Sequence, residues 1–284
     1  MVSDQTDDPT WRLRASRSAL TFFDHVTDVL ELVTQIQSGA AAVVGLHAMM
    51  VNLDLDAEDP DVADQMGRRA DHAKALMASD FGTFHGNLLL GVWGAFEACM
   101  DDMCVAALSD AEMRRTSSVL DRLKVDLGGF LTLADEERWP WVLDQLKRSE
   151  SSSLKEGVAQ FETLLKRCGL GGTVEGTLST LLFKVKAARN VIAHRGARAD
   201  ARLCSAVAEW GLAVGDPVVL SERQLKAALI GMARYVHVVV RRYSTDSPED
   251  LEPAVTYQDL LDRFLTRTTS AFPGTSLDDF FDIA

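Results

Sequence analysis

The sequence predicts an all-α protein, and three observations support that prediction. Apolar residues recur at three- and four-residue spacings over several long segments. Almost no segment has the pattern of a strand, and capping boxes stand where two helical segments begin and glycine where two end. The chain has 284 residues, of which 47% are hydrophobic and 25% charged, so it can bury a sizeable core without disulfides or structural metals. We therefore expect five or more helices packed as a bundle.

An N-terminal helical hairpin is predicted first. After an acidic lead of about ten residues, apolar residues at helical spacing predict a long helix from Arg14 to about Val51. The acidic stretch Asp54–Asp61 interrupts it, and a second, more polar helix is expected to continue to Ser79. We assign residues 1–80 to this lead and helical segment, and we expect the segment to pack on the core.

Residues 81–245 are predicted to form the helical core. Phe81-Gly82-Thr83 marks a joint, after which the strongest helix signal runs over Phe84–Leu108. Glu97 lies inside the apolar stripe of that helix, and a carboxylate facing a core costs several kcal/mol unless a donor or cation meets it. We therefore expect a partner for Glu97. A shorter helix is expected over Asp135–Arg148.

The next two predicted helices flank a glycine-rich loop. The capping box S-L-K-E opens the first helix at Ser153, and Cys168-Gly169 should end it, because glycine adopts the left-handed cap. The loop Gly169–Gly176 lacks the G-K-[ST] ending of a phosphate loop and follows a helix instead of a strand, so it is a weak phosphate-binding signal. The second helix ends in K-A-A-R-N-V-I-A-H-R-G, residues 186–196.

A non-helical segment precedes the last core helix. Leu212–Leu220 contains an Asp-Pro turn between short β-forming runs, which predicts a short hairpin or an extended excursion. A second capping box at Ser221, with Leu220 and Leu225 as a hydrophobic staple, then opens a helix that runs to Tyr243. Residues 246–284 are predicted to be an acidic linker and tail with one short helix, Tyr257–Thr266.

The composition favours a soluble, cytoplasmic protein. The four cysteines lack zinc-binding spacing and are interpreted as reduced thiols, so neither a metal nor a cofactor is expected. The acidic N-terminus does not resemble a secretory signal. The longest apolar stretch, Gly39–Val51, contains His47 and is shorter than the roughly 20 residues of a membrane span. No membrane partner is therefore predicted.

The charge is unevenly distributed along the chain. A net charge of −13 argues at first against a nucleic-acid partner, because phosphate binding depends on lysine and arginine. Residues 181–202, however, contain six basic residues and one acidic residue, a local charge of +5. The candidate RNA-binding residues in this segment are Lys184, Lys186, Arg195 and Arg198. The alternative is that they form a solvated helix face.

Arg189 and His194 are the candidate catalytic residues of this segment. Five residues on a regular helix lie about 140° and 7.5 Å apart, so the two side chains would not share a face. If the helix ends near Ala193, with Gly196 as its terminator, the histidine moves into the cap and both can reach one pocket.

Together these two side chains suit RNA cleavage by attack of the ribose 2′-OH. Arginine stabilises charge at phosphorus, and histidine transfers protons near neutral pH. One histidine cannot easily serve both faces of an in-line displacement, so a two-fold dimer would complete the site. The alternative is structural: Arg189 pairs with Glu97 across the bundle, and His194 merely caps its helix.

The stretch R-N-V-I-A-H, Arg189 to His194, resembles the R-x(4–6)-H motif of HEPN-domain ribonucleases. The helix containing Glu97 and the segments F-E-T-L-L-K-R-C-G-L and W-G-L-A-V-G-D-P-V-V-L-S are similar to the RiboL-PSP branch of that family. The resemblance covers roughly Phe81–Tyr243. It implies a compact helical bundle that dimerises and cleaves RNA without metal. In that case Arg189 stabilises the phosphate, Asn190 positions it, and His194 is the acid and base.

The resemblance also implies a biological setting. Many members of the family are toxins or effectors of prokaryotic toxin–antitoxin and antiphage defence systems, so RNA, with tRNA among the candidates, and an antitoxin or sensor protein are the expected partners. No tyrosine follows His194 closely, unlike the subgroup that is modified at a tyrosine. Because some members have lost catalysis, the alternative function is a non-catalytic helical adaptor that binds a partner protein or nucleotide.

Overall fold

The computed structural model describes residues 11–54, 59–116, 123–150, 158–244 and 266. Over these residues the chain is helical, with no strand, so the predicted all-α class is confirmed. The helices in chain order are α1 (Trp11–Asn52), α2 (Pro60–Ala78), α3 (Gly82–Ser109), α4 (Ala111–Thr116), α5 (Leu127–Thr132), α6 (Asp135–Glu150), α7 (Val158–Arg167), α8 (Gly176–His194), α9 (Ala201–Ala206), the 3-10 helix η2 (Ala208–Trp210) and α10 (Glu222–Ser244).

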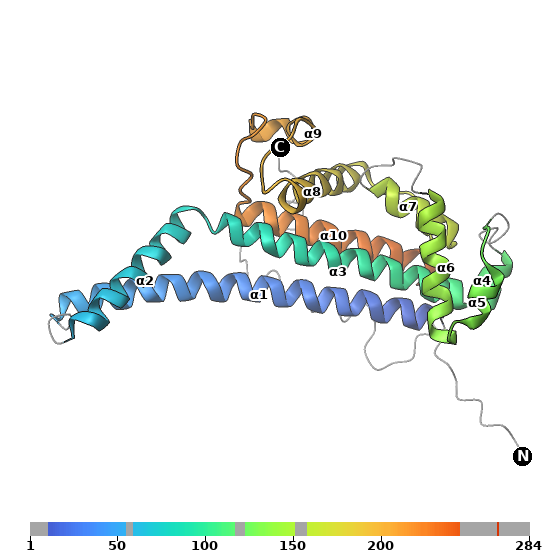
Figure 1. Cartoon of the computed structure of the whole chain (residues 1–284), viewed down its shortest axis with the longest axis horizontal. Coiled ribbons are helices and arrows are strands. Elements are labelled where there is room, and N and C mark those ends of the chain that lie inside the picture. Colours follow the sequence, from blue (N-terminus) through green and yellow to red (C-terminus); the bar gives the residue numbers. More distant parts are fainter. Residues whose placement is uncertain (1–10, 55–58, 117–122, 151–157, 245–265, 267–284) are drawn as a thin grey trace, which may run out of the picture.

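The bundle is built around α3 and α10. In Figure 1, α1 runs along one side of this pair, α7 and α8 lie on the other side, and α6 crosses one end. The ring of Phe96 on α3 is fully buried and lies 5.0 Å from Phe161 of α7 and 5.8 Å from Tyr235 of α10, between ring centroids. This aromatic core fixes the stretch of α3 that carries Glu97.

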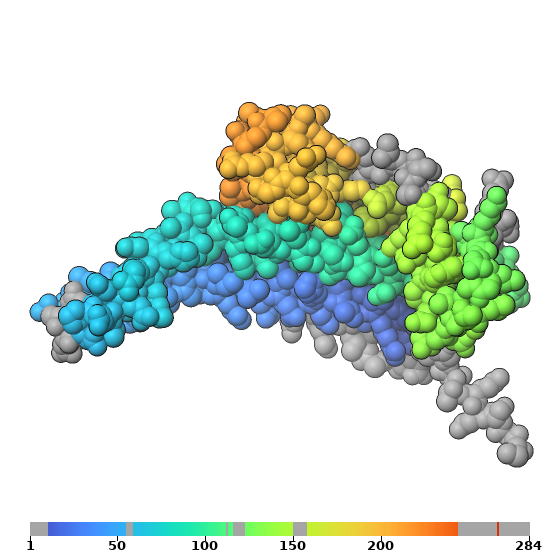
Figure 2. All heavy atoms as spheres, in the orientation of Figure 1, coloured from blue at the N-terminus to red at the C-terminus, as the bar shows by residue number. Residues whose placement is uncertain are grey.

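The second half of α1 and the whole of α2 extend beyond the bundle as a two-helix arm (Figures 1 and 2). The last fully buried residue of α1 is Val33, whereas α2 buries only Ala70 and Ala73. Asp59 caps α2 by accepting hydrogen bonds from the backbone N–H groups of Asp61 and Val62. By length and apolar composition α1 also meets the criteria for a membrane span, as core helices of soluble proteins and signal sequences do; 17% of its most apolar stretch is buried here.

Several predicted helix ends are confirmed by backbone geometry. Gly169 ends α7 with a left-handed φ of 75°, and Gly196 follows α8 with a φ of 58°. Ser221 and Gln224 form the predicted capping box: the Gln224 N–H donates to Ser221 Oγ at 3.2 Å, and the Ser221 N–H donates to Gln224 Oε1 at 2.8 Å. The capping box at Ser153 and the short helix to Thr266 fall outside the described residues, apart from Thr266 itself.

The segment before α10 is extended, and it contains no strand pair within the described region. Of the two predicted forms, the excursion is the one observed. It makes one antiparallel bridge, between Arg198 and Pro217, and the N–H of Ala199 donates to the carbonyl of Asp216 at 2.9 Å. The short helices α4, α5 and α9 were not predicted. Each has six residues, which is too short for a periodic sequence signal.

Candidate functional site

The end of α8 decides where His194 lies. The helix continues through His194, one residue further than predicted, and the N–H groups of Arg195 and Ala197 both donate to the carbonyl of Val191, at 2.9 and 3.1 Å. The prediction that the histidine moves into the cap is therefore wrong. His194 stays on the last helical turn, exposed to solvent and about 140° around the helix from Arg189.

Arg189 meets the predicted partner across the bundle. Its Nη2 lies 3.7 Å from Oε2 of Glu97 on α3, so the expectation that a cation answers this carboxylate is confirmed. The side chains are 25% and 39% exposed, respectively. An ion pair this open contributes about 0–1 kcal/mol to stability.

A second arginine shows what a structural ion pair looks like in this fold. Arg242 contacts Glu162 through both nitrogens of its fork, with Nη1–Oε2 at 3.1 Å and Nη2–Oε1 at 2.9 Å, and it also donates to the carbonyl of Leu170. Tyr235 donates to the same carboxylate at 2.7 Å. Arg189 has one long contact to its carboxylate, and its buried Nε has no hydrogen-bond partner within the described part of the chain. Arg189 is therefore held more loosely than a structural anchor.

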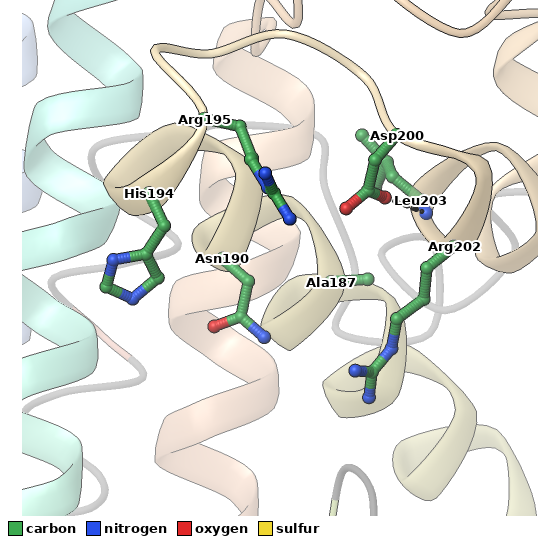
Figure 3. Close-up of a pocket in the computed structure, with 7 residues that line it drawn as sticks. All are labelled: Ala187, Asn190, His194, Arg195, Asp200, Arg202 and Leu203. Carbon is green, nitrogen blue, oxygen red and sulfur yellow. Dashed lines mark hydrogen bonds between the residues drawn. The ribbon is translucent and has the colours of Figure 1, made fainter.

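Asn190 connects Arg189 with His194. Nη1 of Arg189 donates to Oδ1 of Asn190 at 3.3 Å. Because Asn190 and His194 are four residues apart, they lie on one side of α8, about 40° apart. Figure 3 shows both side chains projecting from that side. The three motif residues thus form a chain of neighbours instead of a single converging face.

Asn190 and His194 line an open pocket of about 360 Å³ between α8 and α9. Its volume is within the range of small-ligand sites. The other lining residues are Ala187, Arg195, Asp200, Arg202 and Leu203 (Figure 3). Arg189 is not among them. The pocket therefore combines an imidazole, an amide and two guanidinium groups with one carboxylate.

The far wall of the pocket comes from α9, which the sequence did not predict. Asp200 caps this helix by accepting the N–H of Leu203 at 2.8 Å. Leu203 is fully buried, in a small apolar cluster with Ala188 and Val191 of α8. This packing holds α9 against α8 and so places Arg202 at the pocket. Arg202 is one of the six basic residues of segment 181–202, but no role was predicted for it from the sequence. The available signal was Asp200, a helix-capping residue that could have indicated the start of α9.

Of the four predicted RNA-binding residues, only Arg195 lines the pocket. Lys184 donates to Oε1 of Glu209 at 2.6 Å, Lys186 donates to Gln160, and Arg198 donates to the carbonyl of Gly215 at 3.4 Å. Burial raises the pKa of Glu209, but hydrogen bonds from Lys184 and the backbone outweigh it and leave the pKa below its usual value. Glu209 thus stays charged and competes with phosphate for Lys184.

The electrostatics of the pocket suit an anionic ligand. Arginine forks match phosphate oxygens, and the exposed imidazole of His194 can exchange protons with a bound group. Within the described residues, no three His, Cys, Asp or Glu side chains gather in a way that would hold a metal ion. Comparison of the chain with protein-family models, curated proteins and solved structures finds no match.

Proposed function

We propose that this chain is a metal-independent endoribonuclease of the HEPN type. The observation that carries the proposal is the connection of Arg189 to the pocket through Asn190, at the open end of α8. The loose contact with Glu97 supports it, because an arginine in a basic segment whose terminal nitrogens make only long contacts suits a phosphate better than a structural role.

In this proposal the ribose 2′-OH attacks the adjacent phosphorus, and the bond to the 5′-oxygen of the next nucleotide breaks. His194 takes the proton from the 2′-OH or donates one to the departing oxygen. Arg189 stabilises the charge that develops on the phosphoryl oxygens, and Asn190 positions that group. The products are a 2′,3′-cyclic phosphate and a 5′-hydroxyl. Arg195 and Arg202 bind flanking phosphates.

A second copy of the chain completes the chemistry in this proposal. A proton must be removed on one side of the phosphorus and delivered on the other, and one imidazole reaches one side at a time. Residues 193–196 at the end of α8 are exposed and leave room for a partner's motif. A two-fold axis there would bring two copies of His194 to one RNA strand.

Because the rest of the protein is acidic, only a small part of its surface is suited to contact RNA. The net charge is −13, whereas residues 181–202 carry +5. RNA binding is therefore confined to the motif end of α8, and a partner protein, such as an antitoxin or a sensor, is proposed to control access. We also propose that the protein is a cytoplasmic effector of a prokaryotic toxin–antitoxin or antiphage system. This part of the proposal is based on the family resemblance.

Two observations favour a second candidate function. Arg189 and His194 lie on different sides of α8, and Arg189 already has a carboxylate neighbour. A non-catalytic adaptor would use the same pocket to bind a nucleotide or an acidic segment of a partner protein. RNA cleavage by purified wild-type protein in the presence of a chelator, compared with that of His194→Ala, separates the two. Cleavage by both proteins, or by neither, removes the nuclease proposal.

A further inference from the structure

The arm carries an apolar stripe on its solvent side. The stripe consists of Leu32, Gln35, Gly39, Ala42, Leu46, Met49 and Leu53, in which Gln35 is the one polar member, and these residues follow one another at alternating spacings of three and four. All are exposed, and the large apolar members Leu32, Leu46, Met49 and Leu53 are 40%, 47%, 52% and 59% exposed. This spacing is the heptad pattern by which one helix packs against another.

The stripe is distinct from the face of α1 that packs on α2. A parallel row, containing Ile36, Val43 and His47, is half-buried, and Gly67 of α2 approaches the ring of His47, with a contact distance of 3.5 Å for an added Cβ. From Leu32 to Leu53 the chain contains no Asp, Glu, Lys or Arg. One apolar row thus has its partner helix, and the exposed row keeps four large apolar side chains, Leu32, Leu46, Met49 and Leu53, in contact with solvent, a feature of interaction sites.

We propose that the stripe binds the same stripe of a second copy of this chain, with the two arms antiparallel. A two-fold axis near residue 44 places Gly39 opposite Met49 and Ala42 opposite Leu46. At these two pairs a large side chain meets a small one, which is how facing helical layers interdigitate. The uncharged flanks of the stripe bring no like charges together along the paired segment.

The length of the arm fits this register. The last fully buried residue of α1 is Val33, and Gln37 still donates to Glu222 of α10 at 2.8 Å. The register pairs Gln35 with the partner's Leu53, so pairing covers the projecting part of α1 and ends beside the bundle. Nineteen residues, 35 to 53, span about 28 Å of helix. With α2 behind each α1, the two arms form a four-helix assembly.

Charge at the tip of the arm disfavours a lipid surface as the occupant. The tip carries Asp54, Asp59, Asp61 and Asp64, without a basic residue before Arg68. Carboxylates entering a bilayer are costly, and anionic head groups repel them. The inference is independent of the proposed nuclease, because the stripe and the motif lie on different helices.

The test is the mass of the full chain in solution, measured by sedimentation. Leu46→Glu combined with Met49→Glu places charge in the centre of the stripe. Leu127→Glu combined with Leu131→Glu is the matched control, because both leucines are 63% exposed on α5, away from the arm. We expect the arm variant to have half the mass of wild type and the control to keep the wild-type mass, with unchanged helical circular dichroism in both. Equal masses for wild type and the arm variant overturn the proposal, whatever pairing occurs at α8.

Cysteine cross-linking tests the antiparallel register. In a Cys204→Ser background, the double variant Ala42→Cys, Leu46→Cys should form an intermolecular disulfide on oxidation, and each single variant should form much less, because a Cα separation above about 7 Å cannot be bridged. Efficient cross-linking of the single variants contradicts the register. Flotation of monomeric wild type with phosphatidylcholine–phosphatidylglycerol vesicles, lost in the Glu variant, would assign the stripe to lipid and overturn the proposal.

Discussion

The guanidinium of Arg189 lies 3.7 Å from the carboxylate of Glu97, and the same guanidinium donates to Asn190 at 3.3 Å. Two different nitrogens of one guanidinium, Nη2 and Nη1, thus contact the carboxylate and the pocket residue. A tight ion pair would neutralise the arginine, whereas a long, half-exposed contact orients it and leaves donors for a phosphate. We therefore propose that Glu97 is a positioning residue for Arg189.

Substitution of Glu97 tests this positioning role. For Glu97→Gln we expect a change of at most about 1 kcal/mol in the free energy of unfolding, because the pair is half-exposed. RNA cleavage should fall about 10- to 100-fold, the effect of a misplaced catalytic group. Denaturant unfolding and single-turnover cleavage measure the two effects. Unchanged or faster cleavage would show that Glu97 does not orient the arginine.

Glu162→Gln is the matched control, for which we expect a large loss of stability and no loss of cleavage, the opposite of Glu97→Gln. Its carboxylate takes both nitrogens of the Arg242 fork as well as the Tyr235 hydroxyl, and the paired side chains are only 18% and 15% exposed. Loss of this carboxylate charge should cost on the order of 3 kcal/mol in the free energy of unfolding. Cleavage per folded molecule should stay at the wild-type rate, since the pair lies outside the pocket.

Removal of the Asn190 amide tests the connection between Arg189 and the pocket. In Asn190→Ala the guanidinium loses its 3.3 Å acceptor, and the pocket loses a polar lining group. We expect cleavage to fall about 100-fold, with little change in the melting temperature because the side chain is half-exposed. Asn190→Asp keeps an acceptor for Arg189 but adds a negative charge facing the phosphate. Its cleavage should also fall, and a wild-type rate in either variant would contradict the proposed role.

His237 on α10 predicts a pH effect on stability that is unrelated to the site. Burial lowers its pKa, and the nearby Arg241 and Arg234 lower it further. Below the ordinary value of 6.5, the unfolded chain therefore binds more protons at this residue than the native protein does. Its contribution to the free energy of unfolding should decrease as the pH falls through 6.5, and His237→Gln should flatten that slope. Parallel pH profiles for wild type and variant would contradict the assignment.

Much of the fold can be predicted from the sequence because its signals are local. The apolar spacing of α3, the glycine that ends α7 and the capping box at Ser221 each depend on a few neighbouring residues. Glu97 was identified for the same reason, since a carboxylate within an apolar stripe requires a partner.

The pocket could not be predicted in the same way. The six residues of α9 carry no periodic signal, and the position of this helix depends on the packing of Leu203 against α8. His194 lies on the helix and not in its cap because α8 ends one residue later than expected, which keeps its side chain about 140° from that of Arg189. Local sequence patterns therefore do not predict a site that forms at a helix terminus through a tertiary contact.

The central claim is tested most directly by incubating purified wild-type protein and His194→Ala with total RNA and with tRNA in the presence of a chelator. His194 is exposed, so the variant should keep the wild-type melting temperature, and His72→Ala on α2 serves as a control for an exposed histidine. We predict that wild type and His72→Ala cut RNA to fragments ending in a 2′,3′-cyclic phosphate, whereas His194→Ala leaves it intact. Equal cleavage by His194→Ala and wild type, or no cleavage by either, would contradict the proposal that the end of α8 is a ribonuclease site.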